Sequence, residues 1–241
     1  MTIRGIFFDL GGTLFHYDGS RKRTASAMMK AINQLAGGKV VEPPDIGRAY
    51  AAANEHIARR YAKLDYYLHA DMFRDTFRHA TELLGIGFSD EVFAEYYKAQ
   101  HADIVEGLSL KHDCIETLHH LREAGHYLSI VSNIDEDMLH PLVEREGLGD
   151  YLHHWTSSES AGSCKPHARF FEVSLEKSGL KANEVLFVGD SPEHDVNGAS
   201  AMGMRTALVR NGDKPPPLQS GAATVDPDHT IDHLAELREL V

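Results

Sequence analysis

Hydrophobic positions follow two different periods along this chain. Residues 20–106 carry apolar side chains at three- and four-residue intervals in four successive segments, which is the pattern of amphipathic helices. Short apolar runs at residues 3–8, 126–132, 184–190 and 204–210 are separated by helical stretches, as in alternating strand and helix units. The pattern therefore predicts an α/β protein with a parallel sheet and an inserted all-helical region.

The change of period also predicts where the domains meet. We expect an α/β core domain in residues 1–18 and 107–241 and a helical domain in residues 19–106. Ser89 precedes an amphipathic segment and is a residue type that favours the start of a helix. A last amphipathic helix is expected over residues 231–240.

Polar side chains follow several of the predicted strands. Asp9 comes directly after the first apolar run, in a glycine turn that Thr13 closes; Ser132 ends the second strand, and Asp190 ends the run VLFVGD. Because ligands of parallel sheets bind beyond the carboxyl ends of the strands, we expect these groups to lie together. A carboxylate in such a turn can serve as a covalent nucleophile or a metal ligand, and the glycines let the backbone approach an anion.

Four segments in order, FFDLGGTLF, LSIVS, CKP and VLFVGDSPEHD, resemble the motifs of the haloacid dehalogenase (HAD) superfamily of phosphatases and related hydrolases. The resemblance extends over nearly the whole chain and implies a Rossmann-like core with the helical region as a cap. The first motif of the family reads Asp-x-Asp-Gly-Thr, whereas this chain has Gly11 at the second aspartate. The resemblance thus implies a nucleophile without the usual general acid and base.

The family's scheme gives roles to the matching residues. Asp9 would be the nucleophile that forms an aspartyl-phosphate, and Lys165 would balance the charge of Asp9 and the substrate. Hydroxyl groups of Thr13 and Ser132 would hold phosphoryl oxygens, and Asn133 would orient either the substrate or the loop. A plain turn role for Asn133 is equally open.

The resemblance also implies a magnesium site. Magnesium prefers oxygen ligands and keeps several waters, so two carboxylates and a backbone carbonyl suffice. Asp9 and Asp190 would give the carboxylates, and Gly11 would give its carbonyl oxygen, which does not depend on the side chain. Asp195 would bind the metal directly or through water.

Gly11 changes the expected chemistry. General acid and base assistance is worth roughly 10²–10⁴-fold, or about 3–5 kcal/mol of barrier. We therefore expect that the protein either prefers activated phosphates or recruits an acid from elsewhere. The candidates for this acid, by their proximity to the motifs alone, are His16, Asp18 and His194.

Composition limits the classes of partner. The formal net charge of −12 and the absence of a dense Lys/Arg stripe argue against binding to nucleic acid. No apolar run approaches the roughly 20 residues that span a membrane. Two cysteines and no recognisable secretory segment favour a cytoplasmic protein, expected as a monomer or a homodimer.

A cap of this size would select a small phosphorylated metabolite and exclude macromolecules. Several of its side chains could face such a substrate, although packing or solvent contact is the expectation for any one of them: Arg59, Arg60, Lys63, Tyr66 and Tyr67.

Three other functions remain open from the sequence. A 2-haloacid dehalogenase would use the same nucleophile, but such relatives usually lack the acid pair of the fourth motif. Phosphonatase relatives also carry a small residue at the position of Gly11 and need a cap lysine, for which Lys63 is the one to test. A weakened member that binds a phosphorylated ligand or a partner is the third, and the retention of Asp9, Lys165 and Asp190 argues against it.

Overall fold

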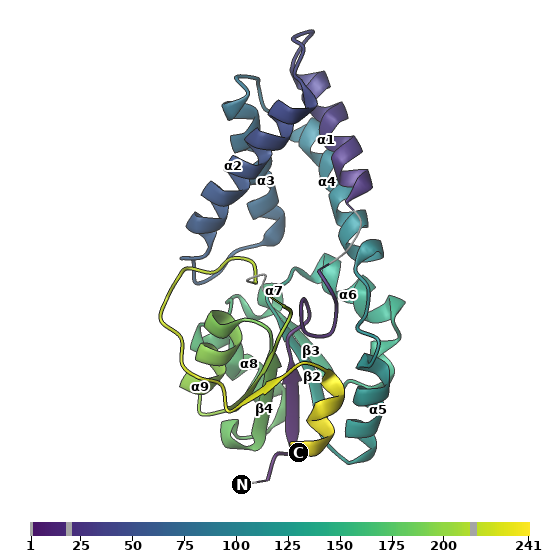
Figure 1. Cartoon of the computed structure of the whole chain (residues 1–241), viewed down its shortest axis with the longest axis vertical. Coiled ribbons are helices and arrows are strands. Elements are labelled where there is room, and N and C mark those ends of the chain that lie inside the picture. The colour runs from purple at the N-terminus through teal and green to yellow at the C-terminus, as the bar shows by residue number, and fades with distance from the viewer. Residues whose placement is uncertain (1, 18–20, 213–215) are drawn as a thin grey trace. The chain divides into compact units, whose positions relative to one another are not determined.

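A computed structural model describes residues 2–17, 21–212 and 216–241. The chain divides into two compact units. The core unit comprises Met1–Tyr17 and Ser109–Val241, and the helical unit comprises Asp18–Leu108. Both are drawn in Figure 1.

The core unit is built on a six-stranded sheet in which all neighbouring strands are parallel. Its first strand lies in the interior, where Phe8 pairs with Ile130 on one side and Val188 on the other. This arrangement confirms the predicted Rossmann-like α/β fold. In spatial order the strands are β3 (His154–Ser157), β2 (Tyr127–Ser132), β1 (Gly5–Phe8), β4 (Val185–Gly189), β5 (Arg205–Val209) and β6 (His229–Ile231).

Helices cover both faces of this sheet, which is why its central strands are apolar along their whole length. Figure 1 shows α8 and α9 on one side of the sheet and α5 and η4 on the other. On the first side, the ring of Phe187 in β4 contacts Phe171 edge to face at 5.4 Å between centroids. The helices of the core unit are α5 (Cys114–Glu123), α6 (Glu136–Arg145), η1 (Leu148–Asp150), α7 (Ser158–Ala161), α8 (Ala168–Ser178), η2 (Ala182–Glu184), η3 (Pro192–Asn197), α9 (Gly198–Ala201) and η4 (Leu234–Glu239).

The carboxyl-terminal segment differs from the predicted amphipathic helix over residues 231–240. Ile231 belongs to strand β6, and its carbonyl accepts a hydrogen bond from the backbone of Arg210. The following turns form the 3₁₀ helix η4, in which Leu234 and Leu237 are buried. Apolar residues three apart lie on one face of a 3₁₀ helix, so this spacing fits the shorter element as well as an α-helix.

The described residues of the helical unit, 21–108, form four helices: α1 (Lys22–Leu35), α2 (Pro43–Tyr61), α3 (His69–Leu83) and α4 (Asp90–Gly107). Helix α1 packs against α4, and α2 packs against α3. In its hydrophobic centre the ring of Phe77 stacks on Tyr96 at 4.9 Å between centroids. The predicted start at Ser89 is confirmed, because its Oγ accepts a hydrogen bond from the backbone N–H of Val92.

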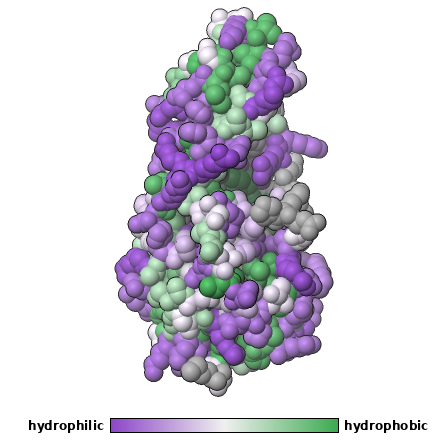
Figure 2. Space-filling view, turned by 60° about the vertical axis from the view of Figure 1, so that its left-hand side comes forward, coloured by the Kyte–Doolittle hydropathy of each residue, from purple (hydrophilic) through white to green (hydrophobic). Residues whose placement is uncertain are grey.

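The surface is mixed in character. On the face drawn in Figure 2, hydrophilic residues predominate and hydrophobic residues form scattered patches. Throughout the described ranges, no helix combines the length and apolar content needed to cross a bilayer.

Candidate active site

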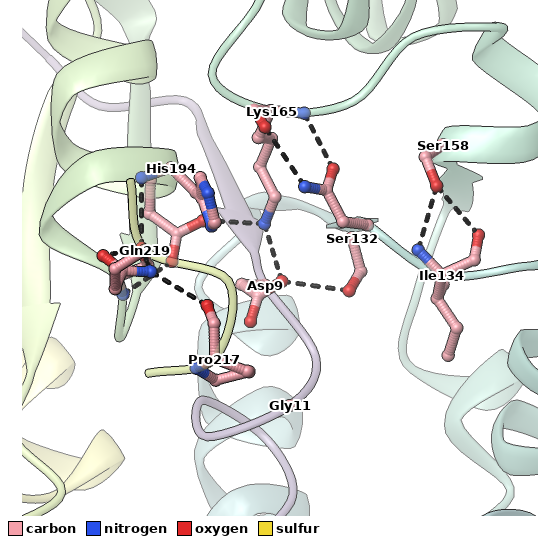
Figure 3. A network of polar contacts seen from close by, with 12 residues as sticks. Asp9, Gly11, Ser132, Ile134, Ser158, Lys165, His194, Pro217 and Gln219 are labelled. Atoms are coloured by element: carbon pink, nitrogen blue, oxygen red, sulfur yellow. Dashed lines mark hydrogen bonds and ion pairs between the residues drawn. The ribbon is translucent and has the colours of Figure 1, made fainter. Parts of the chain in front are cut away.

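Asp9 lies immediately beyond the carboxyl end of β1 and is 7% exposed. Its backbone N–H donates to the carbonyl of Val188 at 2.9 Å, which extends the sheet pairing by one residue. Its Oδ1 accepts hydrogen bonds from Ser132 Oγ at 2.9 Å and Lys165 Nζ at 2.6 Å, as Figure 3 shows. No residue in the described part of the chain donates a hydrogen bond to Oδ2. One carboxylate oxygen is therefore fixed by the protein, and the other is left for a ligand.

Lys165 joins two carboxylates in the buried centre of the site. Its ammonium group donates to Asp195 Oδ1 at 2.7 Å as well as to Asp9. Burial by itself would lower the pKa of Lys165, but the charges of Asp195 and Asp9 outweigh it and raise the pKa. The lysine therefore stays protonated and offsets negative charge at the site.

Asn133 fastens the loop that carries Lys165. The backbone N–H of Lys165 donates to Asn133 Oδ1 at 2.7 Å, and Asn133 Nδ2 donates to the Lys165 carbonyl at 3.2 Å. Both polar atoms of the amide are thus engaged with the loop. Of the roles left open for Asn133 by the sequence, this geometry favours orientation of the loop over contact with a substrate.

Three carboxylates converge beside the lysine. Oxygen atoms of Asp9, Asp190 and Asp195 all lie within 4.8 Å of one another. Burial, and then the charges of Asp9 and Asp195, raise the pKa of Asp190 to about 8. Burial also raises the pKa of Asp195, to about 6, although Lys165 opposes this rise. Such a cluster binds a hard divalent cation well, because the cation offsets both the cost of burying the charges and the repulsion between them.

The three carboxylates are not equally available to a metal. Asp195 already accepts hydrogen bonds on both oxygens, from Lys165 on Oδ1 and from the backbone N–H of Ser191 on Oδ2 at 2.9 Å. Asp190 accepts a bond on Oδ2 from Asn211 at 3.3 Å. The donor set fits magnesium, with Asp9 and Asp190 better placed for direct coordination than Asp195.

The turn after Asp9 requires its glycine at position 12. Gly12 has a φ of +76°, and a Cβ there would lie 2.0 Å from Asp190 Oδ2. A side chain at this position would therefore push Asp190 out of the cluster. The next residue, Thr13, is fully buried, and its Oγ1 has no hydrogen-bond partner among the described residues.

Tyr17 is part of the site and was missed by reasoning from the sequence. The residue as a whole is 47% exposed, but its hydroxyl donates to the Gly11 carbonyl at 2.8 Å, and local burial, followed by the charge of Asp190, raises the pKa of the phenol. A Cβ on Gly11 would lie 2.9 Å from Cε1 of Tyr17. The only signal in the sequence was the pair of adjacent glycines, Gly11 and Gly12. Two residues without side chains leave space in the turn, which a neighbouring side chain can fill.

Asn211 and Lys111 were also missed. Asn211 Nδ2 donates to the Gly12 carbonyl at 2.7 Å and to Asp190, and Lys111 Nζ donates to Asn211 Oδ1 at 2.9 Å. Asn211 follows strand β5 by two residues. The rule that polar groups gather at the carboxyl ends of parallel strands would have found it.

Comparison with known families agrees with this geometry. The model of the haloacid dehalogenase-like hydrolases matches residues 3–203. The chain belongs to this family. It is therefore a hydrolase with the HAD fold, as the motifs predicted.

Two curated relatives are similar over nearly the whole chain, and a third is similar over about half of it. The ribulose-1,5-bisphosphate 5-phosphatase of Halopiger xanaduensis is 29% identical over 98% of each chain. The phosphoglycolate phosphatase of Pectobacterium atrosepticum is 30% identical over 99% of this chain and 92% of its own length. The (S)-2-haloacid dehalogenase 4A of Burkholderia cepacia is 29% identical over 56% of each chain.

Solved HAD structures share the fold. The HAD hydrolase YfnB of Bacillus subtilis, whose crystal structure contains magnesium, has a TM-score of 0.71 and 19% identity and covers 100% of this chain and 99% of its own. The L-2-haloacid dehalogenase of Xanthobacter autotrophicus has a TM-score of 0.67 and 22% identity and covers 99% of this chain and 98% of its own.

The side chains suggested as replacements for the missing acid have different surroundings. Burial first, and then Lys165, lower the pKa of His194 to about 4, so this imidazole is neutral at pH 7 and has no readily lost proton. His16 is exposed, and its backbone N–H bonds to the carbonyl of Ser109. Asp18 lies outside the described residues.

Several cap residues considered as substrate contacts have partners within the helical unit. Arg59 pairs with Glu55, and Arg60 pairs with Asp75. Tyr67 is buried, with its ring edge to face against another tyrosine. These contacts agree with a packing or surface role, and a role in substrate recognition stays a prediction.

Proposed function

We propose that this HAD hydrolase is a magnesium-dependent phosphatase of small phosphorylated metabolites that works through an aspartyl-phosphate at Asp9. The observation that carries the proposal is the asymmetric environment of the Asp9 carboxylate. Lys165 and Ser132 hold Oδ1, while no described residue donates to Oδ2. A nucleophile that is fixed in this way is oriented for attack and needs little rearrangement.

The metal would be held by Asp9, Asp190 and the carbonyl of Gly11, with Asp195 acting through water. Three carboxylates and one lysine give the site a formal charge of −2 when all are ionised, which a divalent cation balances. When bound, the cation would neutralise charge on the transferring phosphoryl group. The hydroxyl of Thr13, which has no partner among the described residues, adds a possible donor to a phosphoryl oxygen.

The HAD relatives support a small substrate. The two that match over almost their whole length are named for phosphatase activity on ribulose 1,5-bisphosphate and phosphoglycolate. Beside Asp190 the core unit has a hollow of about 400 Å³, a size that suits a small molecule, with Asn211 and Gln219 among its lining residues. We propose that the helical unit acts as the cap that selects the substrate.

Dehalogenation is the second candidate, since relatives of both kinds share the nucleophile. The buried pair of Asp190 and Asp195 favours the phosphatase. A reaction that expels halide has no phosphoryl charge to neutralise, so it gains nothing from two further carboxylates that oppose ionisation of each other.

The experiment measures hydrolysis of acetyl phosphate and p-nitrophenyl phosphate, and halide release from 2-chloropropionate, with magnesium or with EDTA. We expect phosphate release that requires magnesium and is lost in Asp9→Asn. Asp226→Asn, a change of an exposed aspartate of the core unit, is the matched control and should retain activity. Halide release that persists in EDTA would replace the proposal by dehalogenation, and metal-independent phosphate release would refute the metal role.

A further inference from the structure

A second group of metal-binding side chains lies in the core unit and shares no residue with the Asp9 cluster. Ligand atoms of His112, Asp113 and His233 all lie within 4.8 Å of one another. Asp113 is the residue before α5, and His233 is the residue before η4. Helices α5 and η4 pack against each other (Figure 1), so residues that are far apart in the sequence meet at one place.

The backbone around this group is held by hydrogen bonds. Asp113 Oδ2 accepts one from the backbone N–H of Ala235 at 3.0 Å, which joins the start of α5 directly to η4. Glu236 Oε1 accepts one from the backbone N–H of His233 at 2.8 Å. The fold therefore sets the positions from which the three side chains extend, as a binding site requires.

The atoms that could bind an ion are not engaged elsewhere. Neither the ring of His112 nor that of His233 forms a hydrogen bond with any described residue, and η4 begins without a side-chain cap. The two rings lie edge to face at 6.0 Å between centroids. Asp113 Oδ1 likewise has no partner in the described part of the chain. Both histidines are exposed and Asp113 is partly buried, so an ion can enter from solvent.

From this arrangement we propose that His112, Asp113 and His233 form a second metal site, which binds a divalent transition metal ion such as zinc. Two imidazoles and a carboxylate suit zinc, whereas magnesium prefers ligands that are all oxygen. Zinc takes bonds of about 2.0–2.1 Å, so its tetrahedral ligands lie about 3.4 Å apart. Exposed side chains can reach that spacing by small rotations, and water would complete the coordination.

The bound ion would tie the carboxyl-terminal segment to α5. Leu234 and Leu237 of η4 are already buried in the core unit, and the ion would add a second attachment beside them. Zinc would bind tightly only while α5 and η4 are packed together, so it would stabilise the folded core unit. This role is independent of the proposed phosphatase activity.

Calorimetric titration of the full chain with zinc, at pH 7.5 in excess magnesium, tests the site directly. We expect one zinc ion per chain. His112→Ala and His233→Ala should each weaken zinc binding more than about tenfold, since loss of even an outer partner of a metal ligand weakens affinity about 10–100-fold. His120→Ala, which removes another exposed histidine of α5, is the matched control and should bind zinc like the wild type.

Thermal unfolding gives a second readout that does not depend on activity. Zinc at about 100 times its Kd should raise the Tm of the wild type by about 5–10 °C, followed by the fluorescence of Trp155 in β3. His120→Ala should show the same rise, and His233→Ala should not. Asp190→Asn should also keep the rise, because it alters the Asp9 cluster and leaves the second site intact.

Several outcomes would overturn the inference. Zinc binding that is lost in Asp190→Asn and kept in both histidine variants would place the ion in the Asp9 cluster. Half an equivalent of zinc per chain, with a doubled mass in sedimentation, would show a site shared between two copies. Absence of zinc binding by the wild type would exclude the site outright. In each case the phosphatase proposal still stands or falls by magnesium-dependent phosphate release.

Discussion

Replacing Asp190 by asparagine in the metal-free protein should remove a pH-dependent loss of stability. Burial and the charges of Asp9 and Asp195 raise the pKa of Asp190 from 3.8 to about 8. Between about pH 4 and 8 the folded state therefore holds a proton that the unfolded state has released. The free energy of unfolding falls as the pH rises through this window, and an asparagine cannot take part in this change.

The expected size follows from the pKa. One pH unit in this window is worth about 1.36 kcal/mol. Between pH 6.5 and 8 the wild type should lose about 1.5 kcal/mol relative to Asp190→Asn, since the slope levels off as the pH reaches the pKa. Other groups titrate mainly below this range, such as Asp195 with a pKa of about 6 and His194 with one of about 4. Their contributions are shared by both proteins and largely cancel in the difference.

Urea unfolding in EDTA at the two pH values measures this difference. The fluorescence of Trp155, the only tryptophan, reports on the core unit because this residue lies in β3. At pH 8, magnesium at about 100 times its Kd should add about 2.7 kcal/mol to the wild type and markedly less to the variant. An identical pH dependence in the two proteins, or a steeper loss in Asp190→Asn, would refute the assignment of this proton to Asp190.

Three further changes test other parts of the structure. Lys165→Met should abolish turnover and lower the stability of the core unit by about 3–5 kcal/mol, because it leaves buried carboxylates without their cation; an unchanged Trp155 transition would contradict this. Asn133→Ala should lower kcat roughly 100-fold, because a small displacement of the Lys165 loop misplaces the ammonium group; full activity would show that the loop holds itself. Phe77→Ala should destabilise the helical unit by about 3–5 kcal/mol in far-ultraviolet circular dichroism, and a matching shift of Trp155 fluorescence would show that the two units unfold together.

The α/β fold could be predicted from the spacing of apolar residues, and several site residues could be predicted from their positions at the ends of strands. Asp9, Ser132 and Asp190 could be brought together in advance, because the carboxyl ends of parallel strands meet at one edge of a sheet. Asn211 obeys the same rule. Tyr17 could not be placed, because its contact with Gly11 depends on the path of an irregular turn rather than on any periodicity.

The role of Asn133 and the type of the last helix could not be predicted either, because both depend on contacts between residues that are distant in the sequence. The amide of Asn133 could face a substrate or a loop, and only the bonds to Lys165 decide between them. The last residues of the chain show apolar spacing that suits two kinds of helix. The choice of a 3₁₀ turn after β6 depends on the pairing of Ile231 with the sheet, which is a long-range contact.

The interior position of β1 has a consequence for synthesis on the ribosome. Gly5 must pair with Tyr127 on one side and Val185 on the other, and the helical unit is encoded between the first strand and both partners. During translation the helical unit, which is rich in local contacts, can fold before either partner has emerged. Strand β1, which ends at the nucleophile, has no partner strand during that time. Correct folding therefore requires that the apolar residues Ile6, Phe7 and Phe8 form no other stable contacts until β2 and then β4 have been synthesised.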